Sequence, residues 1–449
     1  MIVVKLARHL SVVLLILVAA TSAASAQTAK APAAEGAPAA FDQKRFEELR
    51  AEGFEALYSL EYEKARLRFK EIARLFPEHP AGPQFLAASL WLKTLNQSRR
   101  LQASLYNTEG FYKEKDDKPD AKMVAEFREL TRQAKALSEA RLKRDPKDIE
   151  ALYYLGATEG LKAAFGAMVE RSWYSSLRNG GDAVDRHRAV VKLDPNYHDA
   201  RITIGMYDYV TGSLPLPFKL AAAIGGVRGS KKKGLAAIEQ AAREARWAQD
   251  DAKVLLIALY KREKRYLDAY GVANELGAKY PRNYLFKMEA ADALVTHAAE
   301  VRATDPAAAK KSEGEAFAIF ESLVRGAEAK GGPRAPLDLV QYTYGEALFV
   351  AGEADRAAKA FLASSTAPNA EASMVTRSKL RAAQALDVAG KREEAVTQYK
   401  AVLARPNLYD SHEDAKRGLK EPYKTPRKVA DATADSDGDA DATKTAQPN

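Results

Sequence analysis

Apolar residues recur at intervals of three and four along most of the chain, from Phe41 to about Leu419. This spacing places apolar side chains on one face of successive helical turns, so it predicts amphipathic α-helices. The same stretch is rich in alanine, leucine, glutamate, lysine and arginine, which are good helix formers. Runs of alternating β-branched residues are missing from it. The pattern therefore predicts an all-α protein.

Small and aromatic residues repeat within this helical pattern at a fixed spacing. In GFEALYSLEYEKARLRFKEIARLFP, Gly53 is followed by Ala65 after twelve residues, by Phe69 after four more and by Pro77 after eight more. Glycine and alanine allow two antiparallel helices to approach closely, and the phenylalanine fills the space beside them. The proline cannot continue a helix and marks the turn to the next unit. The spacing thus predicts pairs of helices.

Parts of the same spacing recur further along the chain. The recurring positions are Gly156, Ala183 and Pro195; Gly205; Ala269 and Pro281; Gly345, Ala357 and Phe361; and Ala395 with Tyr399. The segments DPKDIEALYYLG (145–156) and DPNYHDARITIG (194–205) align at an offset of 49 residues, so the unit between them is longer than the others. Irregular units are expected around residues 81–247.

This spacing resembles the tetratricopeptide repeat, a helix-turn-helix unit of 34 residues. The resemblance implies an all-α, right-handed superhelical solenoid of about eight antiparallel helix pairs over residues 41–420. The segment GMYDYVTGSLPLPFKLAAAIGGVRGSKKKGLAAIEQAA is similar, more narrowly, to a bacterial exported tetratricopeptide family of undetermined role. Neither resemblance specifies a partner.

The two ends of the chain differ from the helical body. Residues 1–26 have basic Lys5 and Arg8, a short apolar core and an Ala-Ser-Ala cleavage site, which is typical of a secretory signal peptide removed after Ala26. We expect an Ala/Pro-rich linker over 27–40 and a disordered acidic tail over 421–449. The mature protein is accordingly expected in the periplasm of a bacterium.

Charge and cysteine content exclude several kinds of site. The chain has no cysteine, which excludes disulfides, thiolate metal sites and a cysteine nucleophile. Its formal net charge is +9, a modest excess for a chain of 449 residues. Together with the export signal, this balance argues against a nucleic-acid partner.

The stretch AAIGGVRGSKKKGL (222–235) resembles a phosphate-binding loop. A Walker-type loop needs a lysine directly after its second glycine, but Ser230 separates Gly229 from Lys231. A dinucleotide fingerprint needs a preceding strand, and none is predicted here. We therefore expect a connector between two helices. Residues 214–227 are unusually apolar for a loop, which leaves open that they contact a membrane surface.

The sequence shows no constellation that would carry catalysis or hold a cofactor or metal. The histidines lack the HExxH spacing of a zinc site, and the hydrolase motif Gly-x-Ser-x-Gly is missing. His187 and His198 flank a predicted repeat turn, where we expect both to face solvent.

Aromatic residues cluster in the irregular middle of the chain. Tyr154 and Phe165 are assigned to packing by their spacing. First helices of such repeats line the concave face of the superhelix, where partner peptides lie. The candidates for a partner-binding groove are Tyr153, Arg171, Trp173, Tyr174, Tyr207 and Tyr209, although structural packing explains such aromatics equally well.

The sequence favours a non-enzymatic scaffold that binds a protein or peptide partner in the cell envelope. Two alternatives stay open. One is a small-molecule or glycan-binding protein that uses the aromatic middle region, and the other is a membrane-surface adaptor held by residues 214–227.

Overall fold

The computed structural model describes residues 41–101, 120–170, 172–214, 219–220, 229–328, 335–408 and 410–425. These residues form seventeen α-helices and no strand, so the predicted all-α fold is confirmed. None of these helices is both long enough and apolar enough to cross a membrane.

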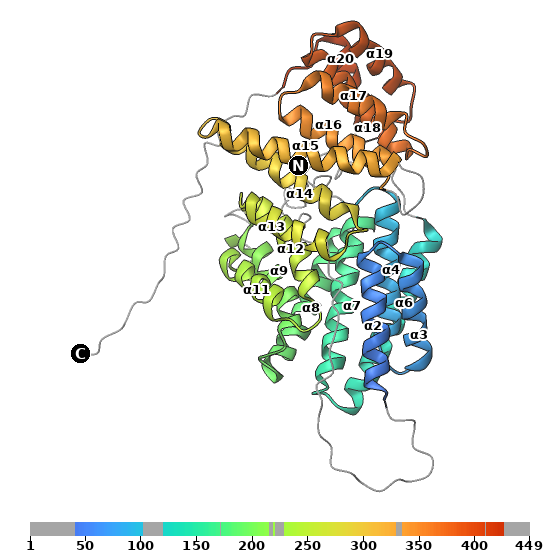
Figure 1. Ribbon diagram of the computed structural model, residues 1–449. Helices are drawn as coiled ribbons and strands as arrows, with labels where there is room; N and C mark the ends of the chain where they lie inside the picture. The colour runs from blue at the N-terminus through green and yellow to red at the C-terminus, as the bar shows by residue number, and fades with distance from the viewer. Residues whose placement is uncertain are drawn as a thin grey trace, which may run out of the picture.

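Sixteen of the helices form eight consecutive antiparallel pairs, as the repeat spacing predicts (Figure 1). The first four pairs are α2 (Gln43–Tyr58) with α3 (Tyr62–Leu75), α4 (Ala81–Gln97) with α6 (Ala121–Arg144), α7 (Ile149–Phe165) with α8 (Trp173–Leu193), and α9 (Arg201–Gly212) with α11 (Lys231–Glu244). The last four are α12 (Gln249–Arg262) with α13 (Tyr266–Lys279), α14 (Tyr284–Val301) with α15 (Pro306–Glu328), α16 (Leu337–Val350) with α17 (Ala354–Ser365), and α18 (Ala372–Val388) with α19 (Arg392–Leu403). A final helix, α20 (Ser411–Lys420), packs on α18 and α19.

Glycines on the first helices lie directly against rings of the second helices. A Cβ atom added at Gly53 would lie 2.3 Å from the Phe69 ring, and one at Gly345 would lie 2.7 Å from the Phe361 ring. Gly156 stands in the same relation to His187, at 2.4 Å. Only glycine leaves room for these rings, so the helix pairs can cross as closely as they do.

The other small residues of the repeat spacing are buried between helices, and its prolines follow helix ends. Ala65, Ala183, Ala269, Ala357 and Ala395 have no exposed surface. Pro77, Pro195 and Pro281 each stand two residues after the last residue of a second helix, α3, α8 and α13 respectively. In the irregular fourth pair, a Cβ atom at Gly234 would lie 2.4 Å from the carbonyl oxygen of Gly205. That pair therefore packs backbone against backbone.

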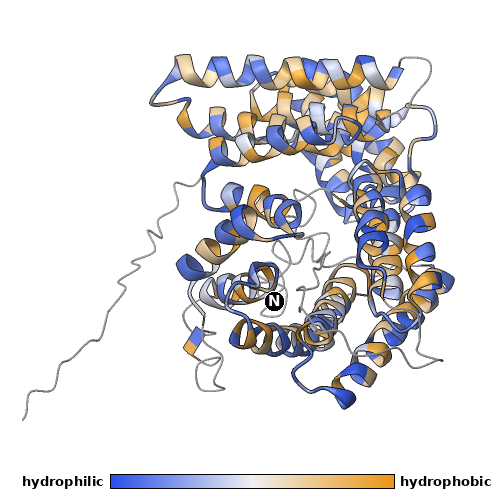
Figure 2. Cartoon of the chain, turned by 60° about the horizontal axis from the view of Figure 1, so that its bottom comes forward, coloured by the Kyte–Doolittle hydropathy of each residue, from blue (hydrophilic) through white to orange (hydrophobic). Residues whose placement is uncertain are grey.

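The helix pairs follow a curved path, and hydrophobic and hydrophilic residues alternate along each helix (Figure 2). Because of this curvature, the first pair stands beside units that come about two hundred residues later. The C-terminal units, α15 to α20, form the top of the molecule in Figure 1.

The expectation that residues 421–449 are disordered is wrong for the first five of them. Residues 421–425 are placed by the structure, and the backbone N–H of Tyr423 donates to Asp387 at 2.8 Å. Residues 1–40 and 426–449, which include the predicted signal peptide and linker, lie outside the described residues.

The glycine contacts lead to a stability prediction. Replacing Gly345 by alanine should destabilise the protein by about 1–3 kcal/mol, because the new methyl group must displace the Phe361 ring. Gly314 on α15 is the matched control, since a Cβ there meets nothing within 4 Å. Gly314→Ala should leave the protein as stable as before or stabilise it by up to about 1 kcal/mol. Urea unfolding of both variants measures the difference, and equal midpoints would contradict this account.

Candidate functional site

Two of the six residues predicted to line a groove are buried instead. Tyr153 and Tyr209 have no exposed surface. The Tyr153 ring stacks on His187 at 4.8 Å and lies 5.1 Å from the ring of Tyr197, so it fills the space between adjacent units. The hydroxyl of Tyr209 donates to Glu263 on the next unit. Both tyrosines are packing residues, because their side chains contact neighbouring units and leave no surface exposed.

Tyr207 is half-buried, with Arg188 over its ring at 5.4 Å. Arg171 and the side chains of Trp173 and Tyr174 lie outside the described residues. The structure therefore does not bring the predicted set together into one described surface.

The expectation that His187 and His198 face solvent as a pair is also wrong. His187 is fully buried, and its Nε2 lies 3.0 Å from the carbonyl oxygen of Tyr153. In the third helix pair, His187 packs against Gly156 as Phe69 packs against Gly53 in the first pair. His198 instead contacts Arg201 and Glu244. Burial lowers the pKa of His187 to about 4, and the hydrogen bond to Tyr153 offsets only part of this effect.

The lysine-rich stretch begins α11, and its described residues act in helix packing. The Ser230 hydroxyl caps the helix by accepting from the N–H of Lys233 at 3.3 Å, and Lys231 pairs with Glu263 at 2.9 Å. A Cβ at Gly229 would overlap the Thr211 hydroxyl, so the chain lies flat on α9 here. These contacts agree with the predicted connector. Most of residues 214–227 lies outside the described residues; of those described, Leu220 is exposed.

The first helix pair closes against the units from α9 to α14, and we call this contact the seam. The Arg50 guanidinium lies 4.0 Å from the centre of the Trp247 ring. Tyr58 stacks on Tyr280 at 5.0 Å, and the Asn283 amide donates to the carbonyl oxygen of Tyr58 at 2.8 Å. The seam therefore occupies part of the concave face that an open superhelix would expose.

Two buried carboxylates accept hydrogen bonds, one across the seam and one within the units beside it. Asp199 accepts from three successive backbone N–H groups, those of Arg246, Trp247 and Ala248, at 2.9–3.1 Å. The hydroxyl of Tyr58 donates to Asp251, which is buried. Burial raises the pKa of Asp251 well above its usual range, and the neighbouring Asp250 raises it further. The hydrogen bonds of Asp199 and Asp251 thus give both carboxylates a structural role.

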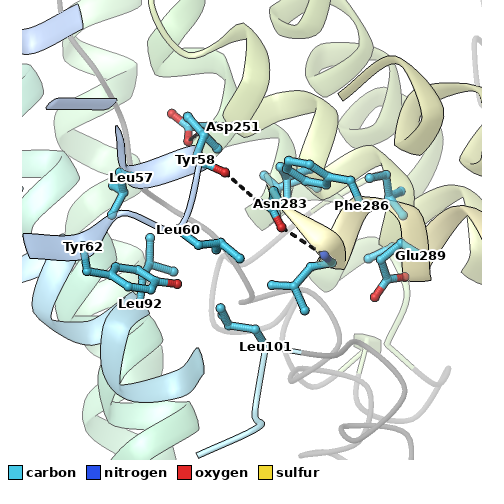
Figure 3. A pocket seen from close by; sticks show the side chains of 15 residues that line it. Leu57, Tyr58, Leu60, Tyr62, Leu92, Leu101, Asp251, Asn283, Phe286 and Glu289 are labelled. Carbon is cyan, nitrogen blue, oxygen red and sulfur yellow. Dashed lines mark hydrogen bonds between the residues drawn. The ribbon is translucent and has the colours of Figure 1, made fainter. Parts of the chain in front are cut away.

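A small apolar pocket lies at the seam, between α2, α4, α12 and α14 (Figure 3). Leu57, Leu60, Leu92, Ile257 and Phe286 are among its lining residues, and its volume is about 100 Å³. Pockets that hold drug-sized ligands measure roughly 300–1,000 Å³. The seam pocket is too small for such a ligand or for a peptide.

A much larger groove of about 820 Å³ lies on the C-terminal units, and we call it the C-terminal groove. Its walls come from α14, α16, α18, α19 and α20, together with residues 421–424. The groove is lined largely by charged residues and tyrosines, whereas the seam pocket is lined mostly by apolar residues. Its size and its lining from successive units make it the candidate functional site.

Two arginines on α18 pack against residues of α16 along the groove. Arg381 makes two hydrogen bonds of 2.6 Å to the Glu346 carboxylate, and its guanidinium lies 4.7 Å from the centre of the Phe349 ring. Arg377 lies 4.6 Å from the centre of the Tyr342 ring. Burial by itself would lower the pKa of Arg381, but Glu346 more than offsets this and the pKa is raised. Both side chains are thus held in fixed positions.

The charges along the groove cancel. Four cations and four carboxylates line it: Arg377, Arg381, Arg417 and Lys424, and Asp292, Glu346, Asp414 and Glu421. Three of the four carboxylates pair with a cation: Asp292 with Lys261, Glu346 with Arg381, and Asp414 with Arg417. Such a surface suits a polypeptide with mixed polar groups better than a polyanion.

This groove was not predicted from the sequence, although the sequence carries a signal for it. Tyr342 precedes Arg377, and Glu346 precedes Arg381, by 35 residues each, which is close to one repeat. Equivalent positions of successive repeats face the same surface, so polar and aromatic residues at this offset mark the groove. The clustered aromatic residues of the middle region indicated a different surface.

The buried imidazole leads to a pH prediction. An unfolded chain protonates His187 near its ordinary pKa of 6.5, whereas the folded chain does so only near 4. The unfolded state thus binds more protons between these values, and this residue's contribution to stability falls as the pH drops through that window, by about 3 kcal/mol. In His187→Phe this part of the pH dependence should be lost, as measured by urea unfolding from neutral to acidic pH. His412→Gln, on α20, should keep the full dependence.

The seam leads to a second prediction. Tyr58→Phe keeps the ring stacked on Tyr280 but removes the donor to buried Asp251, at a cost of about 1–3 kcal/mol. The cost should be larger at alkaline than at acidic pH, because ionised Asp251 needs the donor more than the protonated form does. Tyr266→Phe, half-buried on α13, is the control. A pH-independent cost would contradict the assigned role of Asp251.

No protein-family model and no curated protein matches the sequence. Among solved structures, the human IFIT1 dimer with PPP-AAAA has 13% identity to the chain over 84% of each chain, with a TM-score of 0.42. Yeast Tom70 has 11% identity over 84% of this chain and 89% of its own, with a TM-score of 0.33.

A tetratricopeptide repeat protein from Parabacteroides merdae has 14% identity over 75% of this chain and 99% of its own, with a TM-score of 0.30. With TM-scores below 0.5, these likenesses carry no argument about this chain. The paired helices of this chain, with a glycine of one helix set against a ring of the next, give the fold as a helical repeat of the tetratricopeptide type.

Proposed function

We propose that this protein is a non-enzymatic adaptor that binds a segment of a partner protein in the C-terminal groove. One observation carries the proposal. The groove has a volume of about 820 Å³ and presents polar and aromatic side chains from the first helices of successive units. Such concave faces are extended surfaces onto which a peptide can be laid.

The state of the charged groups supports binding rather than catalysis. Arg381 is held by Glu346, and the Tyr399 hydroxyl donates to Asp387 at 2.9 Å. A general base needs a carboxylate or imidazole directed at substrate. In the described part of the groove, three of the four carboxylates are instead occupied by cations.

The cellular location of the protein is part of the same proposal. Residues 1–26 have the composition of a secretory signal peptide, so we place the adaptor in the bacterial periplasm, where its partner is a protein or peptide of the cell envelope. The cancelling charges of the groove favour protein over nucleic acid, since nucleic-acid sites gain most of their affinity from a surplus of basic groups.

In-cell photo-crosslinking tests the proposal. Val350 lines the groove and is 46% exposed, whereas Val388 does not line it and is 41% exposed, so a photoreactive residue at each gives a matched pair. A reproducible protein partner should crosslink at position 350 and not at 388, and Arg377→Ala should reduce the yield at least several-fold. Mass spectrometry identifies the product.

Equal labelling at the two positions would contradict the assignment of the groove. Crosslinking of position 350 to RNA instead of protein would contradict the proposed class of partner.

A further inference from the structure

We propose that the chain's own segment from Glu421 to Lys424 is an internal ligand of the C-terminal groove, and that a partner binds by displacing it. The inference rests on the proposed function, because it assigns the kind of partner that the same groove takes. That partner is an extended polypeptide segment with an aromatic side chain, entering as the Glu-Pro-Tyr-Lys segment does.

The segment leaves α20 in the conformation of a bound peptide. The helix ends at Lys420, and Glu421 has φ −142° and ψ 146°, which is extended backbone. Pro422 cannot continue the helix and keeps the chain from turning back into it. Residues 421–424 then line the groove formed by the helices of earlier units.

A buried carboxylate holds the backbone of this segment. The N–H of Tyr423 donates to Oδ2 of Asp387 at 2.8 Å, and the Tyr399 hydroxyl donates to the same oxygen at 2.9 Å. Arg392 contacts both oxygens of Asp387, at 2.9 and 3.1 Å, and the Asp387 side chain has no exposed surface. This fixed acceptor recognises a backbone N–H, a group that any extended peptide can supply.

Tyr423 lines the groove, and its ring lies near Phe349, which in turn packs against Arg381. Its ring lies 6.4 Å from that of Phe349, the residue that also lies beneath Arg381. Burial lowers the pKa of Arg381, and Glu346 raises it. Tyr423 makes a smaller contribution that also raises this pKa. The groove thus offers one position for an aromatic side chain next to the site that takes the backbone N–H.

The attachment of the segment is light enough to be exchanged. Glu421, Pro422, Lys424 and Thr425 are exposed, and only Tyr423 is half-buried. A tethered ligand has a high effective concentration at its site, on the order of millimolar for a short tether, so it competes with free peptides even when its intrinsic affinity is low. A partner must therefore bind more tightly than the tethered segment.

Peptide binding in trans tests the inference. The probe is a fluorescein-labelled peptide of residues 421–428 (EPYKTPRK), titrated by fluorescence anisotropy against the full chain and against a chain truncated after Lys420. The truncated chain should bind the peptide at least tenfold more tightly than the full chain. A peptide with alanine in place of the tyrosine should bind the truncated chain at least tenfold more weakly.

A second variant keeps the test informative if truncation disturbs α20. In the full chain, Tyr423→Gly leaves the helix intact and should increase hydrogen exchange of α16 and α18 as well as binding of the probe. Lys424→Ala is the matched control, because it changes a side chain that is exposed, and it should alter neither. Equal binding of the probe by the full and truncated chains, or no binding by either, would overturn the inference.

The crosslinking experiment separates the two proposals. If position 350 captures a partner but the truncated chain does not bind the probe, the adaptor function stands and the internal ligand falls. If the probe binds the truncated chain but position 350 captures no protein in the full chain or in Tyr423→Gly, the segment's own binding to the groove stands, whereas the adaptor function and the displacement by a partner fall.

Discussion

The contact between a glycine of one helix and a ring of the next is the interaction on which the rest of this structure depends. Gly53 with Phe69, Gly345 with Phe361 and Gly156 with His187 all bring two helices close enough to bury their facing sides. A single amphipathic pair cannot cover its own apolar surface, so each pair is stable only when the next one stacks on it. The small angle added at each step produces the curvature of the whole chain.

That curvature has opposite consequences at the two ends of the molecule. Toward the N-terminus, it brings α2 back against the units from α9 to α14, where Arg50 and Asp251 are buried in the seam and Tyr58 is half-buried. This burial lowers the pKa of Arg50 and raises that of Asp251. Toward the C-terminus the concave face stays open as a groove of about 820 Å³.

The C-terminal groove is organised by residues that are themselves immobilised. Arg381 is fixed by Glu346, and Asp387 by Arg392 and Tyr399, so the groove presents a rigid set of polar and aromatic groups. A rigid surface loses little conformational entropy when a peptide binds, and this favours affinity from few contacts. The chain's own Tyr423 already uses two of these groups.

The helices, their pairing and the small and aromatic residues between them could be predicted from the sequence, because these features depend on contacts within one repeat. It could not separate Tyr153 and Tyr209, which are buried, from residues that line a groove, since both kinds recur with the same helical period. Two features are visible only in the folded chain: the seam, where Tyr58 contacts residues 193 and 225 positions away, and the hydrogen bond from Tyr423 to Asp387. Those contacts follow from curvature summed over many units, which no local pattern of residues specifies.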